Sequence, residues 1–463
     1  MTYAATELLT GIDINQFLKI YQMDGFTRNL SESSEMWSYV KQLSEMDAMA
    51  RSVKYLLIDE LGYGAVQAMP ADGSGTFPGA SRSGLQEPEA FYKEWAWTVD
   101  VPRVLEGKTG SDLMQYAKPL ATELDNKQIA FARLKSIELQ GDGSGSIGKL
   151  TADCIPVTAT DTISFVVSEL TADAGRSFVR WFQEGDKIKF ASQAGVAHAE
   201  INDDATAVSY WKITNIAEDT NTISAQPYTS ADVLVDITST TVGTTEPQSG
   251  DAVYRFGTTP NDLTAISTND YASLSEVMCG LETLVANDGR KVHGVNMTGA
   301  IKGTRKDLSA AVIDSKHFQQ LLSELKRKAG KGRYSYDSAF MADEVYDSLV
   351  ESRETDRRFS SIEDTDRGVK GIGYVHGRDK VEFVPDEFCH KQRIWVLPQG
   401  KDAICYLGKD AKQVAPNGND PFHLSVSSSG YGRNMQTFFE QSGVAIVKHP
   451  RALGVIEDFT VST

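Results

Sequence analysis

The chain has 463 residues, of which 41% are hydrophobic and 24% are charged, a globular composition without the bias of disordered or fibrous chains. Its length predicts about two to four domains with sizeable cores, which excludes a disulfide-stabilised mini-protein. Lys and Arg number 46 against 63 Asp and Glu, and the net charge of −17 opposes broad contact with DNA phosphates or anionic membranes. No apolar run approaches about 18 residues and no signal peptide is recognisable, so we expect no membrane partner and synthesis in the cytoplasm.

Residues 1–61 are expected to form weak amphipathic helices. One helix is predicted to begin after Ser33 and Ser34 and to run through Met36 to Met46, with apolar residues at helical spacing. The hydrophobic stripes are too thin for a core of their own, so this terminal arm should lie against something larger.

Residues 62–107 resemble a long two-stranded hairpin. Its tip, residues 70–88, contains four glycines and three prolines, which is typical of a long loop. The returning strand has Trp95, Trp97 and Val99 in alternation with polar or small residues, which predicts one buried face. Ordering such a loop costs backbone entropy, so we expect it to be mobile or held by a neighbouring subunit.

The strongest helical pattern covers residues 111–139. A helix of this length would span about 43 Å, and Pro119 should kink it or separate a short leading turn. The glycine-rich residues 141–148 should then end the helix.

Residues 150–256 read as short strands separated by turn residues, which predicts a self-contained β domain, either a small barrel or a sandwich. The expected strands are CIPV, ISFVV, SFVRWF, DKIKF, YWKITNI, NTISA, VLVDI and DAVYRF. An aromatic group within this domain is expected to form its core, with a carbohydrate or receptor surface as the alternative. Its members are Trp181, Phe182, Tyr210 and Trp211.

The remaining residues, 257–463, mix helices with strands and predict an α+β region. Helices are expected at residues 274–285, 318–328 and 339–350, and strands at VEFV, RIWVL, AICYL, GVAIV and GVIEDF.

Motifs for catalysis or cofactor binding fail on their context. Gly143, Gly145 and Gly148 fit the GxGxxG spacing, but a dinucleotide site needs a strand before it and a helix after it, and here the order is reversed. No GxSxG, HExxH or EF-hand pattern occurs. We therefore expect no catalytic residue, no bound cofactor and no metal site.

A phosphate-binding loop is imitated by Lys108 and Thr109 after Gly107. The position of its first glycine holds Pro102, which has no backbone N–H to donate. We therefore interpret these residues as a helix N-terminus.

The four cysteines, none of them in a CxxC motif, are expected to be reduced and mostly buried. They are Cys154, Cys279, Cys389 and Cys405. Cys389 and its neighbour His390 are read as a core cysteine and a surface histidine, because adjacent side chains on a strand point to opposite faces.

A basic run ends the second predicted helix of the α+β region. Cations favour a helix C-terminus and Gly330 suggests the cap, so we interpret the run as a solvated helix end, with contact to packaged nucleic acid or an acidic neighbour as the alternative. The run consists of Lys326, Arg327, Lys328, Lys331 and Arg333.

The order of these elements resembles the Hong Kong 97-type major capsid proteins of tailed phages. The resemblance covers nearly the whole chain and includes Gly280 to Leu284 with Gly294 downstream, and the closing residues 443–459. It implies an α+β capsid fold divided into five parts. These are an N-terminal arm (1–61), an E-loop hairpin (62–107), a spine helix with the start of the P-domain (108–149), an inserted all-β domain (150–256), and the P-domain and A-domain (257–463).

The resemblance implies a virion shell protein that assembles with itself into hexamers and pentamers, with arm and hairpin contacts between neighbours. Portal, scaffold and decoration proteins are the further partners it implies, and packaged DNA would be contacted weakly and without sequence specificity. An encapsulin-like compartment shell and an α+β enzyme with a β accessory domain are the alternatives.

Some relatives of that family cross-link a hairpin lysine to an asparagine of a neighbour. Between residues 62 and 92 this chain has no lysine, and the only cation there, Arg82, stays protonated and is a poor nucleophile. Lys93 stands at the root of the returning strand, too far from the tip. We expect boiled, reduced particles to run as one band near 50.7 kDa in a denaturing gel.

Overall fold

The chain divides into two units, and each draws on separated stretches of the sequence. Unit 1 combines Met1–Ala50, Tyr92–Ser136 and Tyr406–Val444, and unit 2 combines Arg51–Phe91, Ile137–Cys405 and Ala445–Thr463. The computed structural model describes residues 35–43, 51–58, 85–102, 113–152, 162–168, 179–192, 194, 200–201, 207–217, 220–235, 247–264, 270, 276–285, 289–298, 301–329, 334–354, 373–376, 379–398, 404–408, 412–414, 422–426 and 433–460.

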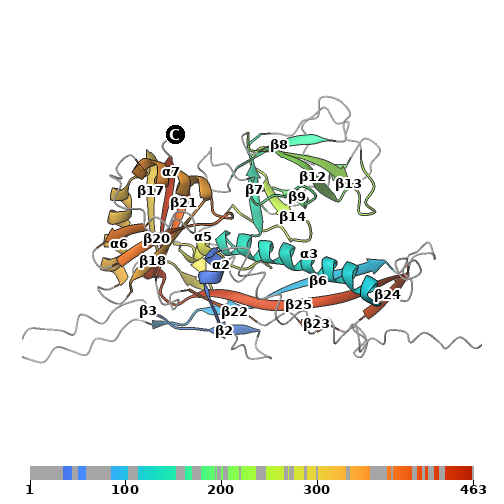
Figure 1. Ribbon diagram of the computed structural model, residues 1–463, viewed down its shortest axis with the longest axis horizontal. Helices are drawn as coiled ribbons and strands as arrows, with labels where there is room; N and C mark the ends of the chain where they lie inside the picture. The colour runs from blue at the N-terminus through green and yellow to red at the C-terminus, as the bar shows by residue number, and fades with distance from the viewer. Residues whose placement is uncertain are drawn as a thin grey trace, which may run out of the picture. The chain divides into compact units, whose positions relative to one another are not determined.

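Unit 1 is built on a sheet whose longest strand is β25, with 15 residues (Figure 1). β25 pairs with β6 without a register shift from Asn434 opposite Pro102 to Gly443 opposite Lys93. At about 3.4 Å per residue, β25 is about 50 Å long. The elements of this unit are α2 (Glu35–Tyr39), β1 (Lys41–Leu43), β6 (Lys93–Pro102), α3 (Leu113–Gln140), β22 (Ile404–Gly408), β23 (Lys412–Val414), β24 (Phe422–Val426) and β25 (Arg433–Val447), of which α3, β22 and β25 continue into unit 2.

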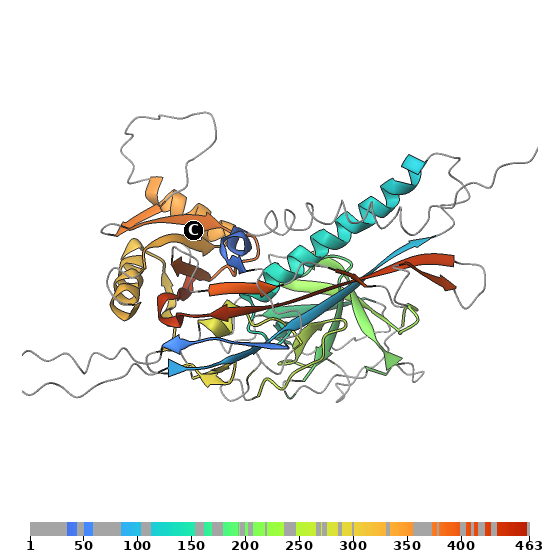
Figure 2. The ribbon, with the colours of Figure 1, turned by 90° about the horizontal axis from the view of Figure 1, so that it is seen from below.

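The long helix predicted at residues 111–139 is confirmed as α3, which has 28 residues and runs alongside β6 and β25 (Figure 2). Pro119 lies within it and separates no leading turn. Trp97 of β6 stacks between Phe131 of α3, at 4.8 Å between ring centroids, and Phe439 of β25, at 5.6 Å. The helix is therefore fixed to its sheet by aromatic rings.

The structure corrects the predicted arm and hairpin. The helix expected to run to Met46 ends at Tyr39, and β1 follows. The hairpin's outgoing strand lies at residues 52–58, which the sequence had assigned to the arm. The returning strand, predicted at residues 91–101, is divided: Phe91 ends β5, which closes the hairpin, whereas residues 93–102 form β6, which pairs with β25. Several predicted parts lie outside the described residues: residues 1–34 of the arm, the hairpin tip up to residue 84, and the segment from Gly107 to Thr109.

In unit 2, α3 is followed by a closed barrel of six antiparallel strands, so the predicted barrel is the correct alternative. The strands are β7 (Ser146–Leu150), β8 (Ile163–Ser168), β9 (Lys187–Ala191), β12 (Tyr210–Ala217), β13 (Thr222–Tyr228) and β14 (Ala252–Arg255), and a small pair, β10 (Glu200–Ile201) and β11 (Ala207–Val208), accompanies them. The glycine-rich residues 141–148 follow the helix, as expected, and β7 begins within them. Residues 179–182, expected to be in a strand, are irregular, and residues 233–235 make a single bridge.

Unit 2 also contains a six-stranded sheet in the order β17-β26-β21-β18-β20-β19. Phe318 of α6 packs on Phe383 of β20 with ring centroids 4.9 Å apart, and Leu321 and Leu325 cover Gly454 of β26, where a side chain would collide with them. The bounds are α5 (Leu281–Leu284), β15 (Lys291–Val292), β16 (Val295–Asn296), β17 (Thr304–Val312), α6 (Ser315–Ala329), β18 (Tyr336–Met341), α7 (Asp343–Glu354), β19 (Gly373–His376), β20 (Asp379–Pro385), β21 (Arg393–Pro398), η4 (Pro450–Ala452) and β26 (Gly454–Thr460).

The edge strand β17 is interrupted by a register shift between Asp307 and Ala311. Ser309 and Ala310 there have φ angles of 48° and 61°, in the left-handed region. Asp458 of the neighbouring strand also has a positive φ, 53°. The edge is therefore bent out of regular strand geometry over this stretch.

Two helix predictions in this region need correction. Of the described residues 276–285, only 281–284 are helical, and the helix expected from residue 339 begins at Asp343, because residues up to 341 belong to β18. The helix at 318–328 is confirmed and forms part of α6. The five strands expected in this region are also confirmed, as β20, β21, β22, β25 and β26.

Candidate assembly elements

The root of the hairpin is a regular antiparallel ribbon within unit 2. β2 (Ser52–Lys54) pairs with β5 (Glu89–Phe91), and β3 (Leu57–Ile58) pairs with β4 (Leu85–Gln86). Both pairs keep the same register, and the amide of Tyr55 donates to the carbonyl of Pro88 between them. The Ser52 hydroxyl donates to Glu89 Oε1 at 2.5 Å. Residues 59–84 connect the two sides.

The inner face of this ribbon is attached to the turn between β15 and β16. The Tyr55 hydroxyl and His293 Nδ1 share a buried hydrogen bond of 2.8 Å. The amide of Glu89 donates to the His293 carbonyl at 3.2 Å, and the Asp270 carboxylate accepts from the amides of His293 and Gly294. Burial raises the pKa of the Tyr55 hydroxyl, so it stays protonated at neutral pH. This set of bonds, the hairpin latch, holds the ribbon's root.

The outer face of the ribbon exposes large apolar side chains. Val53, Tyr55 and Leu57 point to the inner face, where Tyr55 and Leu57 are buried, whereas Leu56 is 56% exposed and Phe91 is 40% exposed on the other face. In an antiparallel pair, alternate residues face opposite sides. The ribbon therefore has apolar groups on both faces, and within the described residues only one face is covered.

Five charged side chains of unit 2 form a buried or nearly buried group, the charge cluster. Its members are Glu282 of α5, Arg290, Arg305 of β17, Arg393 of β21 and Glu457 of β26. Arg305 Nη2 donates to Glu282 Oε1 at 2.9 Å and to Glu457 Oε2 at 2.5 Å, and Arg393 Nη1 lies 2.6 Å from Glu282 Oε2. Burial alone would raise the pKa of Glu282, but the three arginines outweigh it and lower the pKa to about 2. The cluster ties α5 to three strands.

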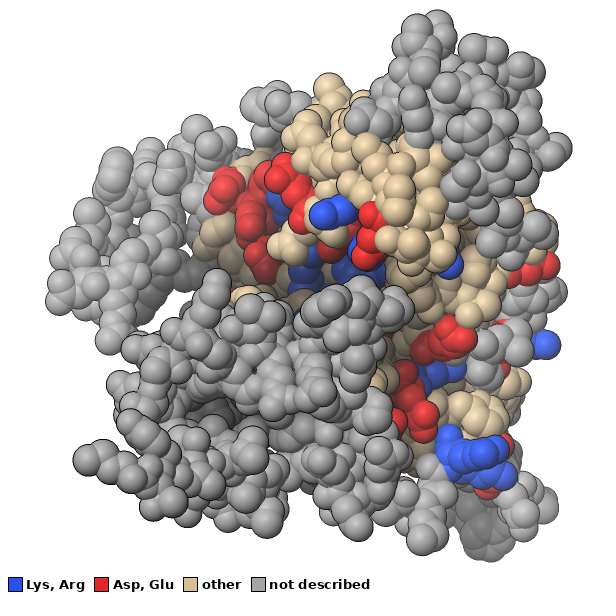
Figure 3. Space-filling view, turned by 90° about the vertical axis from the view of Figure 1, so that its right-hand side faces the viewer, with Lys and Arg blue, Asp and Glu red and all other residues tan. Residues whose placement is uncertain are grey.

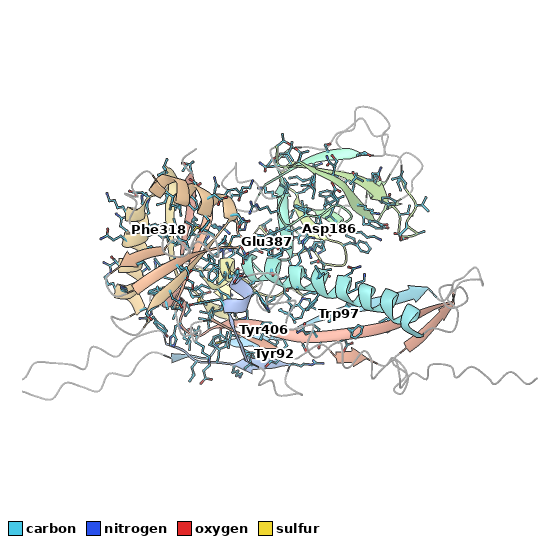
Figure 4. The ribbon with its side chains drawn as sticks, viewed as in Figure 1. Tyr92, Trp97, Asp186, Phe318, Glu387 and Tyr406 are labelled. Atoms are coloured by element: carbon cyan, nitrogen blue, oxygen red, sulfur yellow. The ribbon has the colours of Figure 1, made fainter. Side chains whose placement is uncertain are left out.

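Unit 1 buries a cation in a different way. Lys135 of α3 is 1% exposed, and its ammonium lies over the ring of Trp95 of β6. The same Nζ is 5.2 Å from the ring centroid of Phe131 and 5.5 Å from that of Tyr406. Tyr406, labelled with Trp97 in Figure 4, in turn contacts Trp37 of α2 edge-on at 4.9 Å. We call these three rings around Lys135 the lysine cage.

The predicted aromatic cluster divides between the two sides of the barrel. Trp181, Phe182 and Trp211 lie in the barrel core, which confirms the core prediction for them and excludes a sugar surface made of their rings. Trp181 Nε1 also donates to the carbonyl of Phe388 at 2.9 Å. Tyr210 is buried outside that core, stacked on Tyr228.

The structure supports neither a dinucleotide site nor a metal site at the other residues that the sequence singled out. Gly143, Gly145 and Gly148 follow a helix and precede or lie in β7, the wrong order for a dinucleotide site. Cys389 and His390 lie in a turn, not a strand, and His390 is buried edge-on against Trp181, so the predicted surface histidine is wrong. Burial raises the pKa of the Cys389 thiol.

The structure tests only part of the predictions for the remaining cysteines and for the basic run. Cys279 and Cys405 are buried and form no disulfide among the described residues, and Cys154 is outside the described residues. Lys326, Arg327 and Lys328 occupy the last turn of α6, with Lys328 paired to Glu324 at 2.8 Å. Gly330, Lys331 and Arg333 fall outside the described residues.

Within the described part of the chain, no group of three or more His, Cys, Asp or Glu residues could hold a metal ion. Among the helices described, none is both long enough and apolar enough to cross a bilayer. Blue groups of Lys and Arg on the face in Figure 3 are small and bordered by red groups of Asp and Glu.

Comparison with known proteins finds similarity at the level of structure alone. No protein-family model and no curated protein sequence matches the chain. The capsid asymmetric unit of cyanophage A-1(L) aligns over 99% of this chain and 97% of its own, with 12% identity and a TM-score of 0.38. The capsid of an empty GTA particle covers 92% and 90%, with 10% identity and a TM-score of 0.39. An encapsulin from Synechococcus elongatus covers 40% of this chain and 57% of its own, with 10% identity and a TM-score of 0.24.

Proposed function

We propose that the chain is the major capsid protein of a tailed bacteriophage, which assembles with copies of itself into the hexamers and pentamers of an icosahedral shell around the genome. The observation that carries this proposal is the hairpin ribbon with apolar groups on both faces. Its inner face is buried through the hairpin latch, while Leu56 and Phe91 on its outer face remain exposed.

The physical reason is the marginal stability of a ribbon with only two strands. An isolated pair of strands needs a further hydrophobic partner to be stable in water, and a row of exposed apolar groups marks an interaction site. A second copy of the chain can cover the outer face, because it is present at the same concentration wherever the protein is made. Portal, scaffold and decoration proteins would complete the particle.

The sequence resemblance supports the same proposal, because its element order agrees with the described elements. A hairpin precedes a long helix, a β barrel follows the helix, and an α+β region closes the chain. The parts named arm, E-loop, spine, P-domain and A-domain, and the barrel as an insertion, remain part of the proposal.

Electron microscopy of the purified protein, combined with sedimentation velocity, tests the proposal. We expect closed shells, and we expect Leu56→Ser with Phe91→Ser to leave folded subunits that form none. Glu87→Ser is the matched control, because Glu87 is exposed on the same face of the ribbon. A protein that stays monomeric at all concentrations would contradict the proposal and favour the α+β enzyme.

The content of shells isolated from the natural source distinguishes a phage capsid from an encapsulin-like compartment. A phage capsid encloses DNA, whereas an encapsulin-like compartment encloses a cargo protein. Nuclease-resistant DNA extracted from the shells is the expected result, and a protein cargo without DNA would favour the compartment.

A further inference from the structure

The outer surface of the barrel carries lysines and aromatic rings on adjacent strands. We define the lysine–aromatic strip by Lys187 and Lys189 of β9, Tyr210 and Lys212 of β12, Tyr228 of β13, and Phe256 after β14. Lys187 Nζ lies 4.1 Å from the ring centroid of Tyr210, and Lys189 Nζ lies 4.7 Å from that of Phe256. Tyr210 packs edge-on against Phe256 at 5.1 Å and parallel to Tyr228 at 5.6 Å. Tyr210, which is 3% exposed, lies beneath these side chains and connects them.

Apolar groups at this surface are open to solvent. Phe256 is 45% exposed, and the loop that follows β13 exposes Val233 to 58% and Leu234 to 41%. The loop belongs to the same surface, since its Asp232 carboxylate accepts from the Tyr210 hydroxyl and from Lys187 Nζ, the latter at 3.1 Å. Exposed apolar groups bordered by charged ones are typical of a protein-binding surface.

The charges of the strip are not balanced within the described residues. Lys187 and Lys212 are register partners on β9 and β12, and like charges placed opposite each other destabilise a sheet. Lys187 pairs with Asp232, and the charge of Lys212 also lowers the pKa of Asp232, so one described carboxylate serves two lysines of the strip. An anionic group of a partner would relieve this repulsion.

The charge of the whole chain indicates which partner. At a net charge of −17, copies of the chain repel one another unless the surfaces that meet have opposite sign. A basic strip on an acidic chain provides that complementarity. The barrel is closed, so it offers no free strand edge, and any partner must be recognised by side chains.

We propose that the lysine–aromatic strip docks on an acidic surface of a second copy of the chain, an inference that rests on the proposed assembly. Phe256, Val233 and Leu234 form the apolar centre of the contact, and Lys187, Lys189 and Lys212 form its charged border.

Isotope-coded cross-linking of assembled particles tests this contact without altering a residue. Unlabelled and heavy-isotope-labelled chains are mixed before assembly, and a zero-length reagent then couples lysine amines to carboxylates. We expect peptides with Lys189 or Lys212 to be joined to acidic peptides of the other isotope. Links confined to one isotope in intact particles would overturn this inference and leave the proposed function standing, whereas the absence of any oligomer would overturn both.

A pair of charge-matched variants gives a second test. Lys189→Glu with Lys212→Glu should raise the concentration needed for assembly at least about tenfold, which corresponds to about 1.4 kcal/mol per contact. Lys316→Glu with Arg327→Glu, on exposed positions of α6, makes the same change in net charge and should have a smaller effect. Equal effects of the two variants would contradict the proposal, and thermal unfolding checks that both fold.

Binding of soluble polyanions tests whether the strip serves an external anionic partner instead of a second copy of the chain. If particles of the unaltered chain bind sulfated dextran and the strip variant does not, while assembly of that variant is unchanged, then the strip serves a polysaccharide or nucleic acid and the proposal is wrong. We expect instead that added salt favours assembly less in the unaltered chain than in the variant, because in the unaltered chain salt screens the attraction at the strip as well as the net repulsion.

Discussion

The charge cluster of unit 2 and the lysine cage of unit 1 bury positive charge by two different means. The cluster surrounds Glu282 with guanidinium groups, and its geometry is fixed by paired hydrogen bonds from Arg305. The cage places the Lys135 ammonium against the faces of Trp95, Phe131 and Tyr406. A carboxylate loses its charge in acid, whereas an aromatic face does not titrate. The comparison therefore predicts that the stability contributed by the arginines of the cluster and by Lys135 of the cage responds differently to mutation and to pH.

The largest expected effect is the loss of the central carboxylate of the cluster. Glu282→Gln keeps the side-chain volume but removes the carboxylate charge that Arg290, Arg305 and Arg393 share, and removing one partner of a buried ion pair costs about 3–5 kcal/mol. Urea unfolding measures the free energy of unfolding. Glu382→Gln, at an exposed position of β20 in the same unit, is the control and should change little. Similar losses in both variants would contradict the central role of Glu282.

Acid should reproduce part of that loss in the unaltered chain. The pKa of Glu282 is lowered from 4.5 to about 2 on folding, so its contribution is complete above pH 4.5 and is lost as the pH falls toward 2. The difference corresponds to about 3 kcal/mol. Asp142 acts in the opposite direction, because burial raises its pKa despite hydrogen bonds from Ser144.

Unfolding experiments at pH 7 and pH 3 check this expectation. The unaltered chain should lose more stability between the two than Glu282→Gln does, because other carboxylates titrate equally in both. Equal losses would show that the charge cluster does not hold Glu282 ionised.

A smaller effect is expected at the wall of the lysine cage. A side chain at Gly443 of β25 would collide with the ring of Tyr406, so Gly443→Ala should overpack the site and cost about 1–3 kcal/mol. Gly141→Ala is the control, because a Cβ there would meet only the carbonyl oxygens of Ile137 and Glu138 at 3.5 and 3.6 Å, which is ordinary contact. Thermal unfolding compares the two, and a greater loss at Gly141 would contradict the packing.

The smallest effect should follow from removing the cage's own charge. Lys135→Met keeps an unbranched side chain among the rings, and such volume-conserving changes usually cost less than about 1.5 kcal/mol. Arg393→Met in the cluster should cost several times more, since it leaves Glu282 with less compensation. Urea unfolding measures both losses in the free energy of unfolding. Equal losses would contradict the prediction, because they would show that aromatic faces and carboxylates hold a buried cation equally well.

Periodic elements of the fold could be predicted from the sequence. The helix at residues 111–139 and most barrel strands follow from apolar spacing, which is a local property. The outgoing strand of the hairpin was missed although Val53, Tyr55 and Leu57 alternate with more exposed residues, because the neighbouring residues were read as helical. The helix expected at 274–285 does not include Gly280, whose backbone is extended and packs so closely on the carbonyl oxygens of residues 138–141 that no side chain would fit. Tertiary contact decides that boundary.

The charge cluster and the lysine cage could not be predicted in the same way. Glu282, Arg305 and Arg393 meet only because β17, β26 and β21 lie side by side in the sheet, which no local pattern encodes. Lys135 did leave a signal, since it lies four residues after Phe131 and four before Leu139 on the buried face of α3. A lysine at such a position reads as solvated until the rings that receive it are known.

The distorted edge of β17 bears on how copies can join. A regular edge strand recruits another edge, and each strand added in that way presents a new one, so growth continues without end into fibres. Ser309 and Ala310, held in the left-handed region beside the charged Asp307, interrupt the ladder that such growth would extend. The chain is thereby protected from amyloid-like polymerisation along this edge.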